Sequence, residues 1–151
     1  MSIDLPFHKS WFDDNEINEV IETLKSGWLT TGPKTKRFED DFKDYIGCGY
    51  AIGLNSCTAG LHLALATKRF KAGDEVITTT MTFPATANVI MHERLCPVLV
   101  DVEPGTLTID VNQILEKITP KTRAIMPVHF AGHPCDMDPV MELAEKYKLL
   151  I

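Results

Sequence analysis

The sequence lacks the features of a membrane-spanning or nucleic-acid-binding chain. No apolar run approaches the roughly 18 residues that a transmembrane helix needs. Lysine and arginine number 15 against 21 aspartate and glutamate residues, a formal charge of −6, and no basic stripe appears. Because binding to a nucleic-acid backbone requires clustered positive charge, we expect neither nucleic acid nor membrane among the partners.

Cysteine is scarce and widely spaced. The four cysteines are Cys48, Cys57, Cys96 and Cys135, without a Cys-x-x-Cys pair. This spacing favours reduced thiols over a disulfide framework or a zinc site. The N-terminal segment has no apolar stretch after a basic start, so it is not typical of a secretory signal. We therefore expect a soluble, cytoplasmic protein.

Linkers, internal repeats and low-complexity tracts are also missing, which indicates one domain or part of one. The composition, 44% hydrophobic and 24% charged, is that of an ordinary globular protein. A chain of this length buries about 68 to 70% of its unfolded surface, enough for a substantial core. We predict an aromatic-rich arm over residues 1–12 and the body of the domain over residues 13–151.

The remaining pattern is an alternation of helices and strands. Helical spacing predicts one helix from Asp13 or Asp14 to Gly27 and another that ends at Gly47. Strands are predicted over residues 50–54, 75–79, 97–102 and 123–128, and further helices after residue 56 and around 88–91, 114–118 and 138–147. Near-continuous apolar strands between helices indicate an α/β fold, a three-layer, mainly parallel sheet. Residues 148–151 begin a fifth apolar run, so we expect the front part of a longer fold.

The turn before the third predicted helix carries the clearest binding signal. Ser56 and Thr58 are residue types that cap a helix, and the small Ala59 and Gly60 allow a ligand to approach unpaired backbone N–H groups. Those donors and the positive end of the helix dipole point to the same place, which suits a phosphate. A capped helix without a ligand is the alternative.

Phe83 follows the strand predicted over residues 75–79. In open α/β sheets, ligands bind outside the carboxyl ends of the strands. A flat aromatic ring beside a phosphate seat suits a phosphorylated planar cofactor. The alternative for Phe83 alone is a place in the core.

Two other patterns are weaker. Metal-type side chains gather in one loop, namely His129, His133, Cys135 and Asp136. Gly132 and Pro134 interrupt any helix that would align them, so we favour a structural loop and no metal site. No Gly-x-Gly-x-x-Gly follows the first predicted strand, which disfavours a Rossmann-type nucleotide domain.

The order of segments resembles the DegT/DnrJ/EryC1/StrS family of sugar aminotransferases, which are fold-type I pyridoxal-phosphate enzymes. The resemblance runs from about Phe7 to Ile151. Its landmarks here are Gly27 to Lys34, Phe38-Glu39, Asn55 to Ala59, Gly73 to Ile77, Thr82-Phe83, Ala85 to Asn88, Pro97 to Val102, Asp110, Pro127 to His129 and Asp136 to Asp138. It implies an incomplete large domain of the aspartate aminotransferase type.

The resemblance also implies the ligands and their sites. The cofactor would be pyridoxal 5'-phosphate, with its phosphate on the backbone of Thr58 and Ala59 and its ring on Phe83. The cofactor positions are Ser56, Cys57, Thr58, Ala59 and Phe83, and the sugar-nucleotide positions are Phe7, Gly27, Trp28, Leu29 and Thr30. A homodimer is expected, because such enzymes place the loop at residues 27–30 near a subunit boundary.

Pyridoxal chemistry needs a lysine that holds the cofactor and an acidic residue beside its ring nitrogen. The resemblance places both beyond Ile151, so the 151-residue chain alone is expected to be inactive. The implied reaction of the whole enzyme is amination of a nucleotide-linked keto-sugar, with L-glutamate as the expected donor, for a surface polysaccharide or related glycan. Two alternatives stay open: a pyridoxal-phosphate-dependent sugar dehydratase, and a non-catalytic truncated or split module that binds a phosphate ligand or a partner chain.

Overall fold

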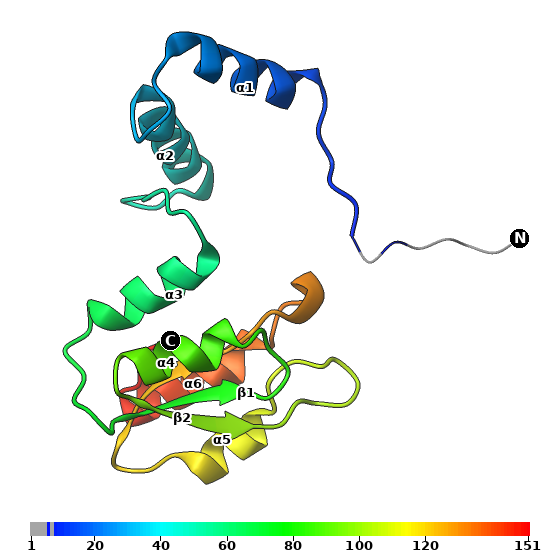
Figure 1. Ribbon diagram of the computed structural model, residues 1–151. Coiled ribbons are helices and arrows are strands. Elements are labelled where there is room, and N and C mark those ends of the chain that lie inside the picture. Colours follow the sequence, from blue (N-terminus) through cyan, green and yellow to red (C-terminus); the bar gives the residue numbers. More distant parts are fainter. Residues whose placement is uncertain (1–5, 7) are drawn as a thin grey trace, which may run out of the picture. The chain divides into compact units, whose positions relative to one another are not determined.

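The computed structural model describes residue 6 and residues 8–151. Its contacts divide the chain into two compact units, which meet between Gly53 and Leu54 and are described separately here (Figure 1). The division predicted from the sequence, an arm up to residue 12 and a domain after it, stays a prediction. Phe7 lies outside the described residues.

The first unit contains the two helices predicted for it, α1 (Asp14–Ser26) and α2 (Pro33–Ile46). Asp13 caps α1: its carboxylate accepts the Asn15 N–H at 2.8 Å and satisfies a donor that the helix leaves unpaired. Each helix ends at a glycine in the left-handed region, where a residue without a side chain meets no steric penalty. The φ values are 72° at Gly27 and 76° at Gly47.

Glu19 of α1 is the residue that connects the two helices. Its carboxylate accepts hydrogen bonds from Lys34 Nζ at 2.5 Å and Arg37 Nη2 at 2.6 Å, and its backbone carbonyl accepts another from Lys34 at 2.9 Å. Neither helix, both of which lie within the described residues, has a buried side chain. Ion pairs, rather than a shared apolar core, therefore join α1 to α2.

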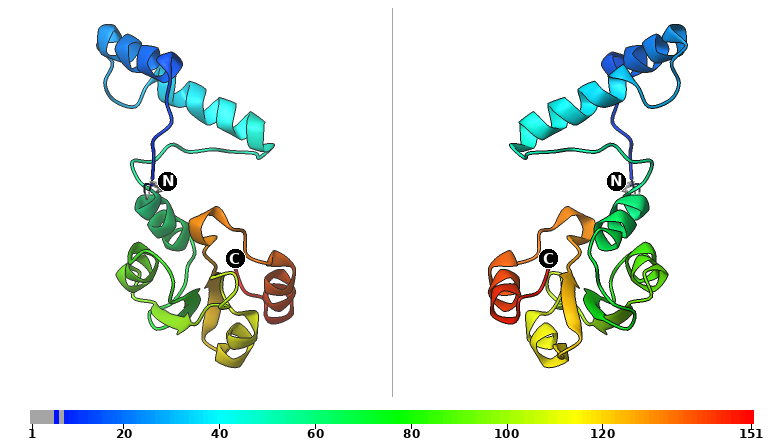
Figure 2. Two further views of the ribbon diagram at one scale, coloured as in Figure 1. Left: turned by 90° about the vertical axis from the view of Figure 1, so that its right-hand side faces the viewer. Right: turned by 90° about the vertical axis from the view of Figure 1, so that its left-hand side faces the viewer.

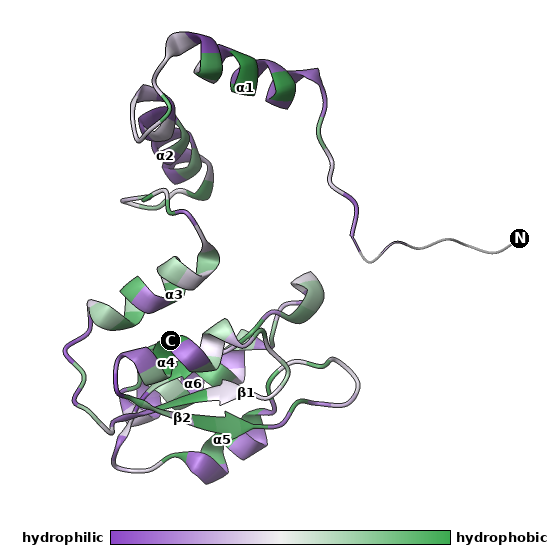
Figure 3. Cartoon of the chain, viewed as in Figure 1, coloured by the Kyte–Doolittle hydropathy of each residue, from purple (hydrophilic) through white to green (hydrophobic). Residues whose placement is uncertain are grey.

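The apolar residues of this unit lie on its surface. Figure 3 shows bands of apolar residues along α1, and Val20 and Leu24 there are exposed. Helical spacing predicts an apolar core face on α1. The apolar stripe is present, but no described residue of the first unit buries it.

The second unit is built on a parallel sheet. Its strands are β1 (Glu75–Thr79), β2 (Cys96–Val100) and β3 (Thr122–Met126), in the order β2-β1-β3. The register of β1 and β2 runs without interruption from Glu75 opposite Cys96. Three of the predicted strands are thereby confirmed, each shifted by no more than two residues.

Helices cover both faces of this sheet. They are α3 (Cys57–Ala66), α4 (Ala85–His92), α5 (Val111–Lys117) and α6 (Met137–Tyr147), and the short 3-10 helix η1 (Phe130–Gly132) lies in the connection between β3 and α6. Figure 2 shows helices on both sides of the sheet. Alternate residues of β1 enter separate cores, since Val76 packs with residues of α3 and α4 and Ile77 with residues of α5 and α6. From β1 the chain passes through α4 to β2, and from β2 it passes through α5 to β3 on the other side of β1. Right-handed crossovers that run in opposite directions along a sheet lie on opposite faces, which agrees with the separate cores of α4 and α5. The three-layer α/β prediction is confirmed.

The strand predicted over residues 50–54 is wrong, since the structure has no strand there. Tyr50 is 91% exposed and Ile52 78% exposed. The segment has the composition of a buried strand, but a strand forms only when a neighbour pairs with its backbone. Within the described residues, neither edge of the sheet pairs with it.

The apolar run at the end of the sequence does begin to pair. Leu150 forms a parallel bridge with Ala124 of β3. The Ile125 N–H donates to the Leu150 carbonyl at 2.8 Å, and the Leu150 N–H donates to the Arg123 carbonyl at 2.9 Å. Residues 148–151 therefore start another strand beside β3, as predicted.

Candidate functional site

A pocket of about 550 Å³ and another of about 470 Å³ contain most of the residues singled out from the sequence. The smaller one lies in the second unit, at the carboxyl ends of β1 and β3. Three segments line it: the start of α3, the loop after β1 and the segment after β3. The lining residues are Cys57, Thr58, Leu61, Thr82, Phe83, Ala85, Thr86, Met126, Pro127, Val128 and His129. Because β1 and β3 are parallel neighbours, their carboxyl ends open at one edge, the usual place for a ligand in an open α/β sheet.

The start of α3 presents backbone donors to this pocket. Ser56 caps the helix by accepting the Ala59 N–H on Oγ at 3.2 Å, and the Ser56 carbonyl accepts the Gly60 N–H at 3.2 Å. In the part of the chain that the structure describes, the N–H groups of Cys57 and Thr58 have no acceptor. These two donors, at the positive end of the helix dipole, can hold an anion.

Phe83 supplies an aromatic wall. Its side chain is 76% exposed, so the alternative of a core position is wrong. The loop that carries it is braced by a hydrogen bond between the hydroxyls of Thr82 and Thr86 at 2.7 Å. An exposed phenyl ring within reach of unpaired donors fits a ligand that has both a flat ring and a negative group.

His129 closes the pocket on the β3 side. Its Nδ1 accepts the Cys135 N–H at 3.0 Å, and the Cys135 thiol donates to the Val128 carbonyl at 3.2 Å. Since Nδ1 acts as the acceptor, the neutral imidazole carries its proton on Nε2, where it can serve as a donor. The described residues include no group of three or more His, Cys, Asp or Glu side chains placed for a metal ion.

The chemistry of the donor set fits a bound cofactor phosphate and ring. Backbone N–H groups, an aromatic wall and apolar side chains such as Leu61 and Met126 suit a phosphorylated planar molecule. Among the described residues, no lysine and no carboxylate lines this pocket. The pocket can therefore bind such a molecule but supplies no amine to hold it covalently.

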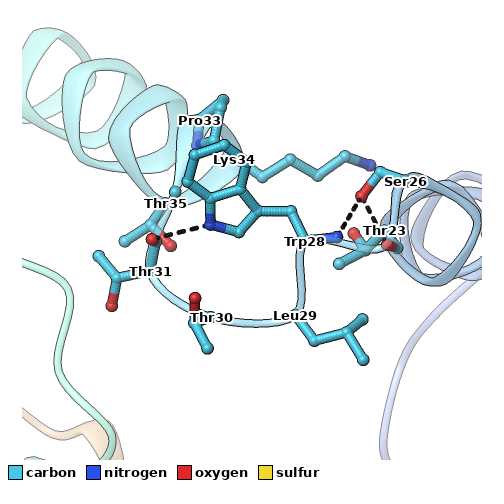
Figure 4. A pocket seen from close by; sticks show the side chains of 10 residues that line it. Thr23, Ser26, Trp28, Leu29, Thr30, Thr31, Pro33, Lys34 and Thr35 are labelled. Carbon is cyan, nitrogen blue, oxygen red and sulfur yellow. Dashed lines mark hydrogen bonds between the residues drawn. The ribbon is translucent and has the colours of Figure 1, made fainter.

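The larger pocket belongs to the first unit and is formed by the connection between α1 and α2 (Figure 4). Its lining residues are Thr23, Ser26, Trp28, Leu29, Thr30, Thr31, Gly32, Pro33, Lys34 and Thr35. It thus brings together three of the predicted sugar-nucleotide positions, whereas Gly27 adjoins it as the end of α1 and Phe7 lies outside the described residues.

Half of the residues that line this larger pocket bear a hydroxyl group, and one, Trp28, supplies an aromatic ring. The Trp28 indole N–H donates to the Thr31 carbonyl at 3.1 Å, and Ser26 Oγ accepts the Trp28 backbone N–H at 3.1 Å. Hydroxyl-bearing side chains beside an aromatic face are the kind of lining that suits a sugar or a nucleoside.

Lys34 is the charged residue of this lining. A hydrogen bond with the Glu19 carboxylate raises the pKa of the Lys34 ammonium, and hydrogen bonds from Lys34 and Arg37 lower the pKa of Glu19. Lys34 therefore remains a cation that is ion-paired with Glu19, and a protonated amine is unsuitable as a nucleophile.

The sequence-based predictions missed several residues that line the smaller pocket, at the carboxyl ends of β1 and β3. The sequence pattern predicts that the strand continues through Val128, but β3 ends at Met126, and Met126, Pro127 and Val128 line the pocket. The rule that ligands bind beyond the carboxyl ends of strands was the signal that could have found them. In the sequence His129 is both a landmark of the family resemblance and a metal-type residue, and neither pattern predicts a contact between His129 and a ligand.

Comparison with known proteins gives one family over most of the chain. A model of the DegT/DnrJ/EryC1/StrS aminotransferase family matches residues 11–151. An uncharacterised protein of Methanocaldococcus jannaschii is 54% identical over 147 residues, which cover 97% of this chain and 38% of that protein. The spore coat polysaccharide biosynthesis protein SpsC of Bacillus subtilis is 45% identical over 147 residues, with the same 97% and 38% coverage.

Solved structures give the same result. Spr1654 from Streptococcus pneumoniae, described as a sugar aminotransferase and solved in a form with pyridoxamine phosphate, has a TM-score of 0.87 and 42% identity, covering 94% of this chain and 36% of its own. The GDP-4-keto-6-deoxy-D-mannose-3-dehydratase of Escherichia coli, solved with hydrated pyridoxal phosphate, has a TM-score of 0.89 and 28% identity, covering 99% of this chain and 40% of its own. This chain spans well under half the length of each of these relatives.

Proposed function

Since the chain belongs to the DegT/DnrJ/EryC1/StrS aminotransferase family, we propose that it forms the cofactor-binding front part of a pyridoxal-phosphate-dependent sugar aminotransferase. The family is pyridoxal-phosphate-dependent and its fold is the one found here. The observation that carries the proposal is the pocket at the carboxyl ends of β1 and β3, where unpaired N–H groups and an exposed aromatic ring lie together.

In this proposal each cofactor residue has a defined task. The N–H groups of Cys57 and Thr58 bind the phosphate. This differs from the sequence-based prediction of Thr58 and Ala59, because Ser56 Oγ already accepts the Ala59 N–H and so keeps the helix start in place. Phe83 stacks on the ring. Bound pyridoxal phosphate supplies an electron sink for bonds at the carbon beside the transferred nitrogen. The chain's own residues orient it.

The substrate would be a nucleotide-linked keto-sugar held by the loop at residues 27–30. The hydroxyl-rich lining and aromatic ring of the larger pocket support this assignment, and L-glutamate is the proposed amino donor. A role in polysaccharide synthesis is supported by the similarity to SpsC. We propose that the protein is a homodimer. We also propose that it lies in the cytoplasm, in keeping with four free thiols in the described residues.

The 151-residue chain alone is proposed to bind cofactor without turnover. Its described pocket has no lysine, and covalent pyridoxal chemistry requires one. The enzyme assignment thus requires a reactive lysine in the native protein that contains this sequence. Reduction of that protein with borohydride, after loading with pyridoxal phosphate and removal of the unbound compound, should label one lysine, as read by peptide mass spectrometry. Absence of a labelled lysine would favour the non-catalytic module.

The experiment that tests the cofactor site is calorimetric titration with pyridoxamine 5'-phosphate, whose amine does not react with surface lysines. We expect saturable binding that inorganic phosphate displaces. Pyridoxamine without its phosphate should bind about tenfold or more weakly, because it loses charge-assisted hydrogen bonds worth about 1.5 to 3 kcal/mol. Equal binding of the two compounds would overturn the assignment of the phosphate seat.

A sugar dehydratase is the second candidate. The similarity to the Escherichia coli dehydratase, with a TM-score of 0.89, supports this second candidate. The two activities differ in product, since an aminotransferase adds nitrogen to the sugar and a dehydratase removes water. Mass spectrometry of the sugar nucleotide after incubation with ¹⁵N-glutamate separates them: incorporated label supports transamination, and loss of water without label supports dehydration.

A further inference from the structure

We propose that Gly32 is a positioning residue that presets the ring of Trp28 in the larger pocket, so that the ligand meets the apolar face of the indole and not its N–H group. The ligand part of this inference rests on the proposed binding of a nucleotide-linked sugar. The positioning part concerns the protein without ligand and can be tested separately.

Space, and not backbone conformation, is what demands glycine at residue 32. Gly32 caps α2 with φ −166° and ψ −155°, an extended conformation that any residue adopts. A Cβ added there would lie 2.7 Å from Cε2 and 2.8 Å from Cδ1 of Trp28, and closer still to Nε1. Carbon atoms in contact are normally about 3.5 to 4.0 Å apart. The indole therefore occupies the place that a side chain at residue 32 would take.

Two hydrogen bonds hold the Trp28 ring in that place. Its backbone N–H donates to Ser26 Oγ, and its indole N–H donates to the Thr31 carbonyl, both at 3.1 Å. Ser26 is fixed in turn, since its hydroxyl donates to the Thr23 carbonyl at 2.7 Å. Figure 4 shows the indole folded back over the loop toward Thr31 and Pro33.

This arrangement defines what Trp28 offers to a ligand. Indole has one polar group, the N–H donor, and here the Thr31 carbonyl already accepts it. The side chain is nevertheless 56% exposed. What remains for a ligand is the apolar ring face, which suits stacking on a nucleobase or on the C–H face of a sugar ring.

The first test measures the ring in the absence of ligand. Trp11 is the other tryptophan of the chain, so Trp11→Phe leaves Trp28 as its single tryptophan, which can be excited apart from the three tyrosines. In that background, Gly32→Ala should shift the Trp28 emission to the red and increase its quenching by acrylamide. Gly49→Ala is the matched control, because a Cβ at that glycine meets no atom within 4 Å. Unchanged emission and quenching in Gly32→Ala would overturn the proposal.

A double-mutant cycle covers the case in which Gly32→Ala fails to fold. If Gly32→Ala acts through the clash with the indole, it should lower the unfolding midpoint more when Trp28 is present than in the Trp28→Ala background, where only the change of the helix N-cap remains. An equal loss of stability in both backgrounds would contradict the proposal.

The ligand part is tested with UDP-glucose and GDP-mannose as probes, titrated into the protein that contains this sequence. Gly32→Ala should weaken binding of whichever probe binds about as much as Trp28→Ala does, roughly tenfold for a lost stacking contact. Trp28→Phe, which keeps an aromatic face, should retain most of the affinity. A shift of Trp28 fluorescence without probe binding would leave the positioning role standing and count against the proposed sugar-nucleotide site. Normal probe binding by Gly32→Ala would overturn the ligand part.

Discussion

At the scale of single residues, Phe83 is the clearest example of a side chain that serves ligand binding and contributes little to the stability of the fold. A phenylalanine ring that is 76% exposed buries little apolar surface in the described protein, so folding gains little from it. Its place in a pocket with unpaired backbone donors gives the ring a use that folding does not explain. The same reasoning applies to Cys57 and Thr58, whose N–H groups stay unpaired.

Phe83→Ala should therefore weaken binding of pyridoxamine 5'-phosphate and leave folding intact. Loss of an aromatic stacking contact is expected to cost about tenfold in affinity. The free energy of unfolding should change by less than about 0.5 kcal/mol, as for other exposed positions. Phe38→Ala is the control, because Phe38 is also exposed but lies on α2. Equal effects of the two changes in calorimetric titration would contradict a specific role for Phe83.

At the scale of elements, the connection between α1 and α2 depends on charge. Glu19 bonds both Lys34 and Arg37, and neither helix has a buried side chain. Exposed ion pairs contribute modestly and are weakened by salt. The first unit should therefore respond to pH and ionic strength, whereas the second unit, with two apolar cores on its sheet, should respond less.

Acidification should loosen the α1–α2 connection through Glu19. The pKa of Glu19 is lower in the folded protein than its ordinary value of 4.5, because Lys34 and Arg37 bond its carboxylate. A lowered folded pKa means that the stabilisation is complete above the ordinary value and is lost as the pH falls through the folded one. Quenching of Trp28 fluorescence in the Trp11→Phe background should rise over that acid range. Glu19→Gln should show no such acid transition, and a transition of equal size in Glu19→Gln would contradict the role of Glu19.

The sequence predicted most elements because their signals are local. Capping residues and terminal glycines marked α1 and α2, and apolar runs marked β1, β2 and β3. The segment at residues 50–54 failed because strand pairing depends on a distant neighbour, which composition does not reveal. The rule for parallel sheets predicts that Phe83 lies near the start of α3, but among the described residues the strand expected before α3 is absent, so the rule holds here only for the loop after β1. The contact between Trp28 and Gly32 was not, because no periodic pattern describes how a side chain folds over its own loop.

At the scale of the whole molecule, much apolar surface remains exposed. Among the large hydrophobic residues on the surface are Phe38, Phe42, Tyr50, Ile52, Met91 and Leu99. Leu150 has only begun to pair with β3. Among the described residues, no helix is both long and apolar enough to cross a membrane. Exposed apolar patches and open sheet edges favour association with other protein surfaces.

The isolated 151-residue chain should consequently self-associate. We expect sedimentation velocity to show a weight-average mass above the monomer mass of 16.9 kDa that increases with protein concentration. High salt should not dissolve these assemblies, because apolar contact is not screened as charge is. A single monomeric species at high concentration would contradict this expectation.

The central claim is that the start of α3 holds the cofactor phosphate, and one pair of substitutions at Cys57 tests it most directly. Proline is tolerated at the first position of a helix, and Ser56 before it already has the extended conformation that a following proline requires, φ −162° and ψ 154°. Cys57→Pro thus removes one N–H donor and keeps the helix. Cys57→Ala removes the thiol and keeps the donor.

Calorimetric titration of both variants with pyridoxamine 5'-phosphate measures whether the Cys57 N–H contributes to binding. We predict that Cys57→Pro binds about 10- to 100-fold more weakly than the unchanged protein, the cost of one hydrogen bond to a charged group. Cys57→Ala should bind as the unchanged protein does, and circular dichroism should show the same helix content in both variants. Equal affinity of the two variants, with α3 intact, would contradict the phosphate seat at the start of α3.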